Sequence, residues 1–214
     1  MTTTSRERGK INVHTNSRYL RELRKTLSLS ELQKSVLFGA IMGDGCIIPT
    51  ASGKNYRLQI EQSHKQKEYV FWKYEIFKEF VITLPRHIRG SINSWKFRTV
   101  SHREFIKARC MFYRNGKKIL PRKLDFILNP LALAVWFMDD GCLDKDSGYI
   151  LNTQNFTFEE NTRLKEFLSR KLNVDISVHR DKTYHRLFVK SKSMAVFRNV
   201  IDSYVHPVMR YKLS

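Results

Sequence analysis

Two aspartates stand at corresponding points of the sequence, each at the end of an apolar run. Asp44 follows residues 37–43 and Asp140 follows residues 133–139, and each is followed by a glycine, a cysteine and a branched aliphatic residue. A single aspartate before glycine is most often a turn former. Two apolar helices that pack on each other, however, would bring both carboxylates together at ends where the helix dipole disfavours negative charge. Such a pair needs a counter-charge, which a divalent metal ion would supply.

A lysine also recurs late in each of the two regions. Lys118 lies in Gly116–Pro121 and Lys212 lies in Arg210–Leu213. Magnesium binds oxygen ligands, keeps several waters, and is commonly held by one or two carboxylates together with phosphate oxygens of a substrate. A lysine beside the scissile phosphate would stabilise the charge that develops there. The paired residues therefore indicate phosphodiester hydrolysis, and the alternative is that the lysines are ordinary surface residues.

These residues belong to an internal repeat, which predicts the elements that position them. Corresponding positions are 96 residues apart at the two aspartates, 92 apart in the strand-like segments 58–62 and 150–154, and 90 apart in the segments 95–101 and 185–191. Similar offsets at several places indicate two copies of one unit with small insertions and deletions. Each copy is predicted to run helix, two strands, helix, two strands, helix.

The repeat divides the chain into a basic N-terminal leader, residues 1–30, a first half, residues 31–121, and a second half, residues 122–214. Both halves open with a helix-start signal. Ser28–Glu31 has the form of a capping box, and Asn129–Pro130 places a cap residue before a first-turn proline. Apolar spacing further predicts amphipathic helices over residues 67–82 and 157–172.

The charge of the chain is strongly positive and is spread along its length. Lysine and arginine number 39 against 20 aspartates and glutamates in 214 residues, a formal charge of +19. Cations spread over a fold and interleaved with aromatic residues favour a nucleic acid over a membrane as the partner. No run approaches the ~18 apolar residues of a membrane span, and the start has no apolar signal-peptide core. We therefore expect an intracellular protein, in a mitochondrion, a chloroplast or a bacterial cytoplasm, with no membrane partner.

The chain resembles the LAGLIDADG homing endonucleases, in particular the monomeric group that carries two motifs. The likeness rests on both Asp-Gly motifs, on segments 136–141, 151–154 and 156–160, and on Tyr211–Leu213. The resemblance implies an α/β (α+β) fold with a pseudo-twofold duplicated αββαββα unit. The motif helices would form the central interface, and two antiparallel sheets would form a saddle on double-stranded DNA. It also implies a monomer.

The resemblance assigns a metal site to residues of this sequence. The carboxylates of Asp44 and Asp140 would bind Mg²⁺ or Mn²⁺, and the backbone carbonyls of Gly43 and Asp139 would complete part of its shell. Two departures from the family pattern stand in the second motif. Val135 replaces a common glycine, and Asp139 adds a carboxylate in the position of Gly43, where its role is open between capping a turn and contacting metal.

Four more side chains complete the implied active site. Lys118 and Lys212 match the active-site lysines of the family, and Gln62 and Gln154 resemble its glutamines near the scissile phosphates. The resemblance thus implies six catalytic residues, three from each half.

Alternation along the predicted strands indicates which side chains face DNA. In residues 57–61 the odd positions are polar and the even positions are apolar, so the odd positions would lie on the DNA side. The later strands alternate in the same way, and the alternative is an ordinary solvated sheet face. The predicted DNA-facing residues are Arg57, Gln59, Glu61, Lys96, Arg98, Arg186 and Lys190.

These observations predict a site-specific DNA endonuclease that makes a metal-dependent double-strand break in a long, asymmetric target and promotes intron or intein mobility. One alternative is a maturase that binds intron RNA and assists splicing. Another is a non-catalytic DNA-binding regulator on the same fold. Retention of both aspartates and both lysines favours cleavage over the two alternatives.

Overall fold

The computed structural model describes residues 17–90, 92–144 and 147–214. The first sixteen residues of the predicted leader therefore lie outside the described residues. The chain forms two compact units, one made of residues up to Lys34 with Gly45–Arg109, the other of Ser35–Asp44 with Cys110–Ser214. Throughout the described ranges, the helices are too short or too polar to span a membrane.

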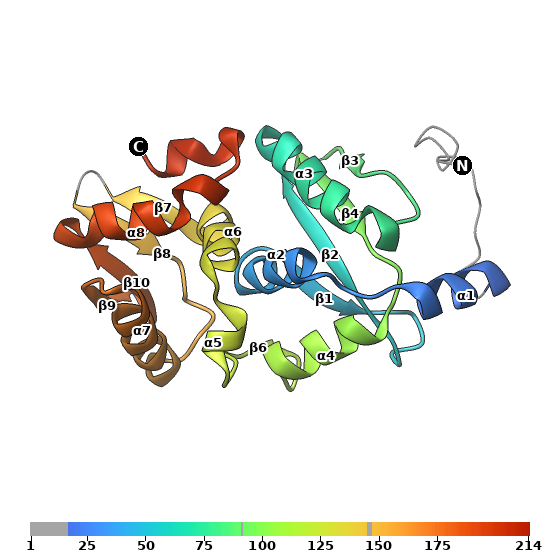
Figure 1. Cartoon of the computed structure of the whole chain (residues 1–214), viewed down its shortest axis with the longest axis horizontal. Coiled ribbons are helices and arrows are strands. Elements are labelled where there is room, and N and C mark those ends of the chain that lie inside the picture. The colour runs from blue at the N-terminus through green and yellow to red at the C-terminus, as the bar shows by residue number, and fades with distance from the viewer. Residues whose placement is uncertain (1–16, 91, 145–146) are drawn as a thin grey trace. The chain divides into compact units, whose positions relative to one another are not determined.

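The first unit carries a four-stranded antiparallel sheet in the order β1-β2-β4-β3. Helix α3 packs on one face of this sheet, where its Tyr74 ring meets Phe97 edge to face with ring centroids 6.0 Å apart. Helix α1 lies outside the repeat, and Ser17 caps its first turn. The helices and strands from residue 18 to residue 112 are α1 Arg18–Thr26, α2 Glu31–Met42, β1 Cys46–Pro49, β2 Tyr56–Ser63, α3 Lys67–Phe77, β3 Arg86–Ile88, β4 Ser94–Arg98 and α4 Arg103–Phe112 (Figure 1). Most of α2 and the end of α4 belong to the second unit.

The second unit repeats this order with a sheet β7-β8-β10-β9. Helices α7 and α8 pack against strand β10, and α8 also packs against α6. The elements are β5 Tyr113–Arg114, β6 Lys117–Lys118, α5 Leu124–Ile127, α6 Pro130–Asp140, β7 Gly141–Asp144, β8 Gly148–Leu151, α7 Phe158–Leu172, β9 Ile176–Asp181, β10 Tyr184–Lys190, α8 Met194–Ile201 and a 3₁₀ helix Pro207–Lys212. The predicted αββαββα order and the two antiparallel sheets are confirmed.

Helix boundaries follow local capping chemistry, with two differences from the sequence prediction. The first motif helix is capped by a reciprocal pair, in which Ser30 Oγ accepts from the Gln33 N–H and Gln33 Oε1 accepts from the Ser30 N–H. The capping box therefore lies two residues later than the predicted Ser28/Glu31 pair, because α2 begins at Glu31 and Ser30 is the residue that precedes it. Helix α3 ends at Phe77 rather than continuing to residue 82, since a 3₁₀ turn closes it.

The strand register corrects one detail of the repeat. Phe97 of β4 lies opposite Ile60, and Leu187 of β10 lies opposite Leu151. If Phe97 and Leu187 correspond, as the 90-residue offset requires, Ile60 corresponds to Leu151, and the offset in these strands is 91 rather than 92. A shift of one residue reverses the face on which a side chain lies. Gln62 then corresponds in register to Thr153, one position before the predicted glutamine.

Candidate active site on the paired motif helices

The two motif helices approach closely because small residues lie at their contact. A Cβ atom added at Gly39 would lie 2.3 Å from the Ala132 carbonyl oxygen and 2.7 Å from Val135 Cβ. One added at Gly43 would lie 2.4 Å from Asp139 Cβ. Real Cβ atoms do not approach that closely, so both glycines are needed for the backbones to pack. The larger Val135 of the second motif is accommodated because it faces Gly39.

This packing brings three carboxylates into one electrostatic cluster, which we call the acidic centre: Asp44, Asp139 and Asp140. Asp44 is exposed, Asp140 is half-buried, and Asp139 is only 7% exposed. Burial, together with the negative charges of Asp44 and Asp139, raises the pKa of Asp140 to about 7. Lys118 and Lys212 act in the opposite direction. The acidic centre thus holds more negative charge than its own lysines neutralise.

Each predicted lysine reaches the motif helix of its own half. Lys118 Nζ donates to the Gly43 carbonyl oxygen at 2.6 Å, and Lys212 Nζ donates to the Asp139 carbonyl oxygen at 2.7 Å. These are the two carbonyls predicted to complete the metal shell, each from the residue before the motif aspartate. A carbonyl oxygen has two lone pairs, so it can accept from lysine and still face a cation. Burial lowers the pKa of Lys212, while the three carboxylates raise it.

Lys118 is positioned by a short hairpin. Tyr113 of β5 pairs with Lys118 of β6, and the connection is the two-residue turn Asn115-Gly116 with φ of 50° and 79°. Two positive φ values are required by the tight turn that best joins antiparallel strands, and Asn-Gly is its preferred sequence. The sequence analysis missed this hairpin, although the Asn-Gly pair is the signal that predicts it.

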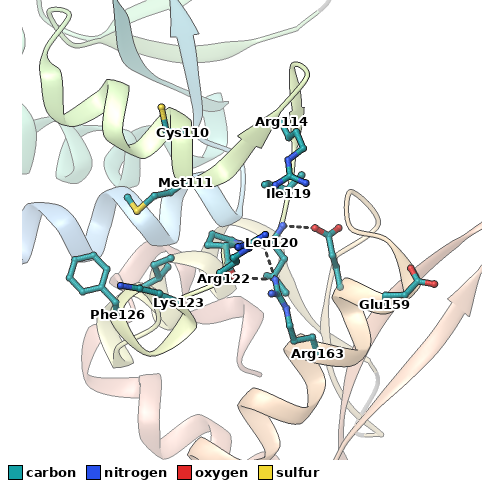
Figure 2. Close-up of a pocket in the computed structure, with 13 residues that line it drawn as sticks. Cys110, Met111, Arg114, Ile119, Leu120, Arg122, Lys123, Phe126, Glu159 and Arg163 are labelled. Carbon is teal, nitrogen blue, oxygen red and sulfur yellow. Dashed lines mark hydrogen bonds between the residues drawn. The ribbon is translucent and has the colours of Figure 1, made fainter.

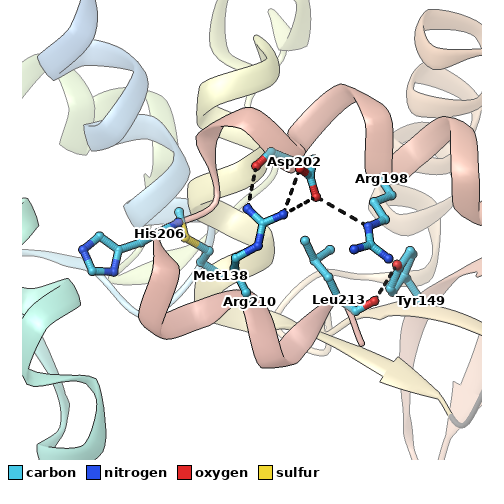
Figure 3. Close-up of polar contacts among 7 residues, drawn as sticks. All are labelled: Met138, Tyr149, Arg198, Asp202, His206, Arg210 and Leu213. Atoms are coloured by element: carbon cyan, nitrogen blue, oxygen red, sulfur yellow. Dashed lines mark hydrogen bonds and ion pairs between the residues drawn. The ribbon is translucent and has the colours of Figure 1, made fainter.

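Lys212 is positioned by a 3₁₀ helix that is tied down at three places (Figure 3). The Asp202 carboxylate accepts from Arg210 Nη2 at 2.9 Å to each oxygen and from Arg198 Nε at 3.4 Å. We call Asp202 and Arg210 the C-terminal clamp. The Tyr149 hydroxyl donates to the Leu213 carbonyl at 3.1 Å, one residue beyond the lysine.

The third tie joins this segment to the motif helix itself. The backbone N–H of His206, at the start of the 3₁₀ helix, donates to Met138 Sδ of α6 at 3.2 Å. Met138 directly precedes Asp139 and Asp140 in the sequence. The support of Lys212 is therefore continuous with the end of α6 that presents the carboxylates.

The donor set suits a hard divalent cation. Carboxylate oxygens of Asp44 and Asp140 and carbonyl oxygens of Gly43 and Asp139 are ligands that Mg²⁺ prefers, and the excess negative charge at Asp140 favours a cation there. Across the described ranges, no group of three or more His, Cys, Asp and Glu side chains is arranged to hold a metal ion by itself. The residues present therefore fit an ion that takes its remaining ligands from water and substrate phosphate.

The two predicted glutamines lie in different surroundings. Gln62 belongs to β2 of the first unit, is 4% exposed, and accepts from Lys73 Nζ at 3.5 Å. Gln154 lies beyond the end of β8 and donates to Asp181 Oδ2 at 2.9 Å. Sequence reasoning missed Lys73, a fully buried lysine that packs 4.2 Å from the Tyr69 ring centroid, because a lysine in a helix normally indicates a solvated face.

The predicted alternation of the sheets is confirmed. Leu58 and Ile60 of β2 are buried, and the intervening polar residues lie on the opposite face. Across the strands of that face, Arg98 Nε donates to Gln59 Oε1 at 2.7 Å, and Lys96 pairs with Glu61 at 2.6 Å. In β10, Leu187 and Val189 are buried, so Arg186 and Lys190 share the other face. Lys190 pairs there with Asp175 at 3.1 Å.

One hollow of the second unit is separate from the acidic centre. It has a volume of about 800 Å³ and is lined by residues such as Met111, Ile119 and Phe126 (Figure 2). Beside it, Arg163 Nη2 donates to the carbonyls of Leu120 at 2.8 Å and Pro121 at 3.1 Å. Glu160 Oε1 accepts from the Leu120 N–H at 2.8 Å. These bonds hold the segment that joins the two halves against α7. The polar side chains at the hollow therefore have a structural role in holding this segment.

Comparison with known proteins places the chain among nucleases. A model of the LAGLIDADG DNA endonuclease family matches residues 34–197. The protein named "Probable intron-encoded endonuclease 1" from Wickerhamomyces canadensis is 32% identical over 92% of this chain and 91% of its own length. The protein named "Cytochrome b mRNA maturase bI2" from Debaryomyces hansenii is 31% identical over 83% of this chain and 72% of its own length.

A solved structure agrees over almost the whole chain. The homing endonuclease I-WcaI bound to its DNA recognition sequence has a TM-score of 0.89 and 29% identity, and the match covers 95% of this chain and 96% of that one. The similarity extends across both motif helices and both sheets.

Proposed function

The chain belongs to the LAGLIDADG DNA endonuclease family, and we propose that it makes a double-strand break in a long DNA site by divalent-metal-dependent hydrolysis. The observation that carries this proposal is the matched pair of helix ends. Each presents an aspartate, and each has a lysine bonded to the carbonyl of the preceding residue. Two equivalent sets of groups suit two equivalent reactions, one on each DNA strand.

Asp44 and Asp140, with the carbonyls of Gly43 and Asp139, would hold Mg²⁺ or Mn²⁺. When bound, such an ion supplies an activated water and charge neutralisation at the scissile phosphate. The protein's own contributions are positional and electrostatic. Asp140 must lose its proton to serve as a ligand, which its raised pKa opposes until a cation approaches. The two lysines would stabilise negative charge on the phosphate oxygens.

Gln62 and Gln154 remain proposed contacts near the scissile phosphates. Their hydrogen bonds to Lys73 and Asp181 would fix the orientation of each amide. Gln154 is the more accessible of the two, because Gln62 is 4% exposed and lies on the α3 side of its sheet with Leu58 and Ile60.

The polar faces of the two sheets are proposed to lie on the DNA as a saddle, with a monomer spanning the site. Arg98 with Gln59 and Lys96 with Glu61 present paired donors and acceptors, which suit base edges in the major groove. In the second sheet Arg186 and Lys190 occupy the equivalent face, where Lys190 pairs with Asp175. Different residues on the two sheets would select an asymmetric target.

The biological role proposed is mobility of an intron or intein, in an organelle or a bacterial cytoplasm. The intron-encoded relative from Wickerhamomyces canadensis supports it. A second candidate, assistance of intron RNA splicing, is favoured by one observation, the relative named as a cytochrome b mRNA maturase. The complete acidic centre and both lysines favour cleavage as the first proposal, since splicing assistance needs neither.

The experiment that tests the proposal is incubation with a library of long DNA duplexes, with and without Mg²⁺, followed by sequencing of cut ends. We expect paired cuts on both strands at one asymmetric site, only with the metal present. The doubly substituted Asp44→Asn/Asp140→Asn protein should bind the selected site and leave it uncut. Asp125→Asn is the matched control, because that carboxylate is 82% exposed and lies on α5. Cutting without metal, or by the double variant, would contradict the proposal.

A further inference from the structure

A cationic pocket lies in the first unit, between helix α1 and the first sheet. It has a volume of about 270 Å³. Among the described residues that line it are five cationic side chains and no carboxylate: Arg24, Arg57, Arg86, Lys96 and Arg98. Like charges collected in a concave site repel one another unless an anion is present, so the composition of this pocket indicates an anionic ligand.

The strand register places four of these cations on one face of the sheet. Gln59 lies opposite Arg98 and Glu61 opposite Lys96, and Lys96 lies opposite Arg86. Arg57, two residues before Gln59, shares that face. This is the face away from α3, since α3 packs against Phe97. The pocket therefore opens on the side of the sheet proposed to meet DNA.

One donor of Arg57 is left unsatisfied by the protein. Its Nε is buried and makes no hydrogen bond, whereas Arg98 bonds to Gln59 and Lys96 pairs with Glu61. A buried donor without an acceptor costs free energy, and more so on a charged group. Burial and the neighbouring charge of Arg98 also lower the pKa of Arg57. An oxyanion seated here would accept from Arg57 and relieve the repulsion.

Helix α1 forms the other wall, and it lies outside the repeated unit. Leu20 is buried in the first unit, and His102 Nε2 donates to the Arg24 carbonyl oxygen at 3.1 Å. Both contacts fix α1 so that Arg24 reaches the pocket. In the second half the helix that precedes the motif helix is the four-residue α5, Leu124–Ile127, which carries no cation, so the cation that Arg24 adds to the pocket belongs to the first half.

We propose that this pocket binds one backbone phosphodiester of the target DNA, clamped between α1 and the outer end of the first sheet. The inference rests on the proposed function, because it takes DNA as the ligand. Arg57, predicted from the sequence to face DNA, is thereby assigned to phosphate binding rather than to base recognition. Phosphate contacts fix the position of a protein along the duplex without carrying sequence information. A clamp on one half only would anchor the enzyme at one end of its asymmetric site.

The first test measures DNA affinity as a function of salt for the wild type, Arg57→Met and Lys78→Met, without Mg²⁺. Lys78 is 57% exposed, pairs with Glu75 and lies outside the pocket, so its variant is matched in charge. We expect Arg57→Met to lower affinity about tenfold and to reduce the slope of log K against log salt by about 1, on every duplex tested. A slope equal to that of Lys78→Met would overturn the proposal, as would a loss confined to one base-pair position.

The second test changes the DNA, so it does not depend on the folding of a variant. Single phosphates of the target are replaced in turn by neutral methylphosphonates. We expect one or two adjacent positions near one end to weaken wild-type binding and to have no effect on Arg57→Met. If no position loses its effect in the variant, the proposal is wrong.

Two further readouts separate this inference from other outcomes. Inorganic phosphate that raises the Tm of the wild type but not of Arg57→Met, with identical DNA curves, would assign the pocket to free phosphate and overturn the DNA clamp. Cleavage with Mg²⁺ is scored on the same wild-type samples. Salt-dependent binding through Arg57 without any cleavage would leave the clamp standing and contradict the proposed endonuclease.

Discussion

The two halves of the molecule present their lysines in the same way but support them by different means. Lys118 sits on a two-residue hairpin, and Lys212 sits on a 3₁₀ helix tied down by the C-terminal clamp. Both nevertheless donate to the carbonyl before a motif aspartate. The features that the two halves share are the ones that the proposed reaction would use. The helix ends and the lysine contacts are common to both halves, while the segments that carry them have diverged.

A second difference lies at the helix ends themselves. Gly43 in the first motif is replaced by Asp139 in the second, and Asp140 is more buried than Asp44. The second half therefore concentrates negative charge that the first half does not. The proposed cleavage of both strands would not require equal electrostatics in the two halves, and four measurements test how far the halves differ.

The largest effect is expected from the motif aspartates. Asp44→Asn and Asp140→Asn should each lower the rate of double-strand cleavage by roughly 10³-fold or more, because each removes a metal-binding charge. DNA affinity measured without metal should change little. Rates are measured by single-turnover cleavage of a labelled duplex, with Asp125→Asn as the control. A much smaller loss for one aspartate would show that the halves are not catalytically equivalent.

The free energy of unfolding of the metal-free protein should depend on the ionisation of Asp140. The pKa of Asp140 rises from its ordinary value of 3.8 to about 7 on folding, so the folded protein holds the extra proton between these values. The metal-free protein should therefore lose stability as pH rises from about 4 to about 7, by up to about 4 kcal/mol. Asp140→Asn should remove this loss and raise the free energy of unfolding at pH 8.

Denaturant unfolding of the metal-free protein at pH 5 and pH 8 measures this effect. The control is Asp125→Asn, whose exposed carboxylate should leave stability within about 0.5 kcal/mol of the wild type at both pH values. If Asp140→Asn is no more stable than the wild type at pH 8, the electrostatic difference between the two helix ends is not present in solution.

The lysines are expected to have the next largest effect on cleavage. Lys118→Met and Lys212→Met should each lower kcat about 10²-fold, or about 2.7 kcal/mol in the barrier, since each removes one cation near the developing charge. Quantifying nicked intermediates assigns each lysine to a strand. Accumulation of opposite nicks in the two variants would confirm that the halves act on different strands, and identical nicks would contradict it.

A smaller effect is expected from the C-terminal clamp, the Asp202–Arg210 pair of the second half. Asp202→Asn should loosen the Pro207–Lys212 helix and lower kcat about tenfold, with KM unchanged, because Lys212 is positioned less well. The slowed step should be the strand that depends on Lys212. Exchanging the charges, in Asp202→Arg/Arg210→Asp, should restore part of the rate. Equal slowing of both strands would show that the clamp serves stability rather than position.

The sequence predicted those features that depend on neighbouring residues or on the repeat. Asn129 before Pro130 correctly marked the start of α6, since a cap and a first-turn proline act within one turn. The alternation of β2 and β10 correctly separated buried from polar faces. The recurrence of a lysine late in each half singled out Lys118 and Lys212, the family resemblance matched them to active-site lysines, and the structure adds which carbonyl each one contacts.

Features that depend on distant packing were missed. The burial of Lys73 requires α3 to lie on the sheet, and the Asp202–Arg210 pair requires the chain to turn back after α8. The register shift at Thr153 depends on how β8 pairs with β10, which an offset between similar short segments cannot determine. These contacts are set by tertiary structure, and neither residue type nor local spacing reports them.

The division of the chain into units has a consequence for attempts to recombine halves of such enzymes. Residues 35–44 of the first motif belong to the second compact unit, although the strands that follow them belong to the first. Val36, Leu37 and Ile41 are almost completely buried there. A fragment cut between residues 121 and 122 would carry this apolar helix without its packing partner, so a chimera should exchange both motif helices together rather than one half at a time.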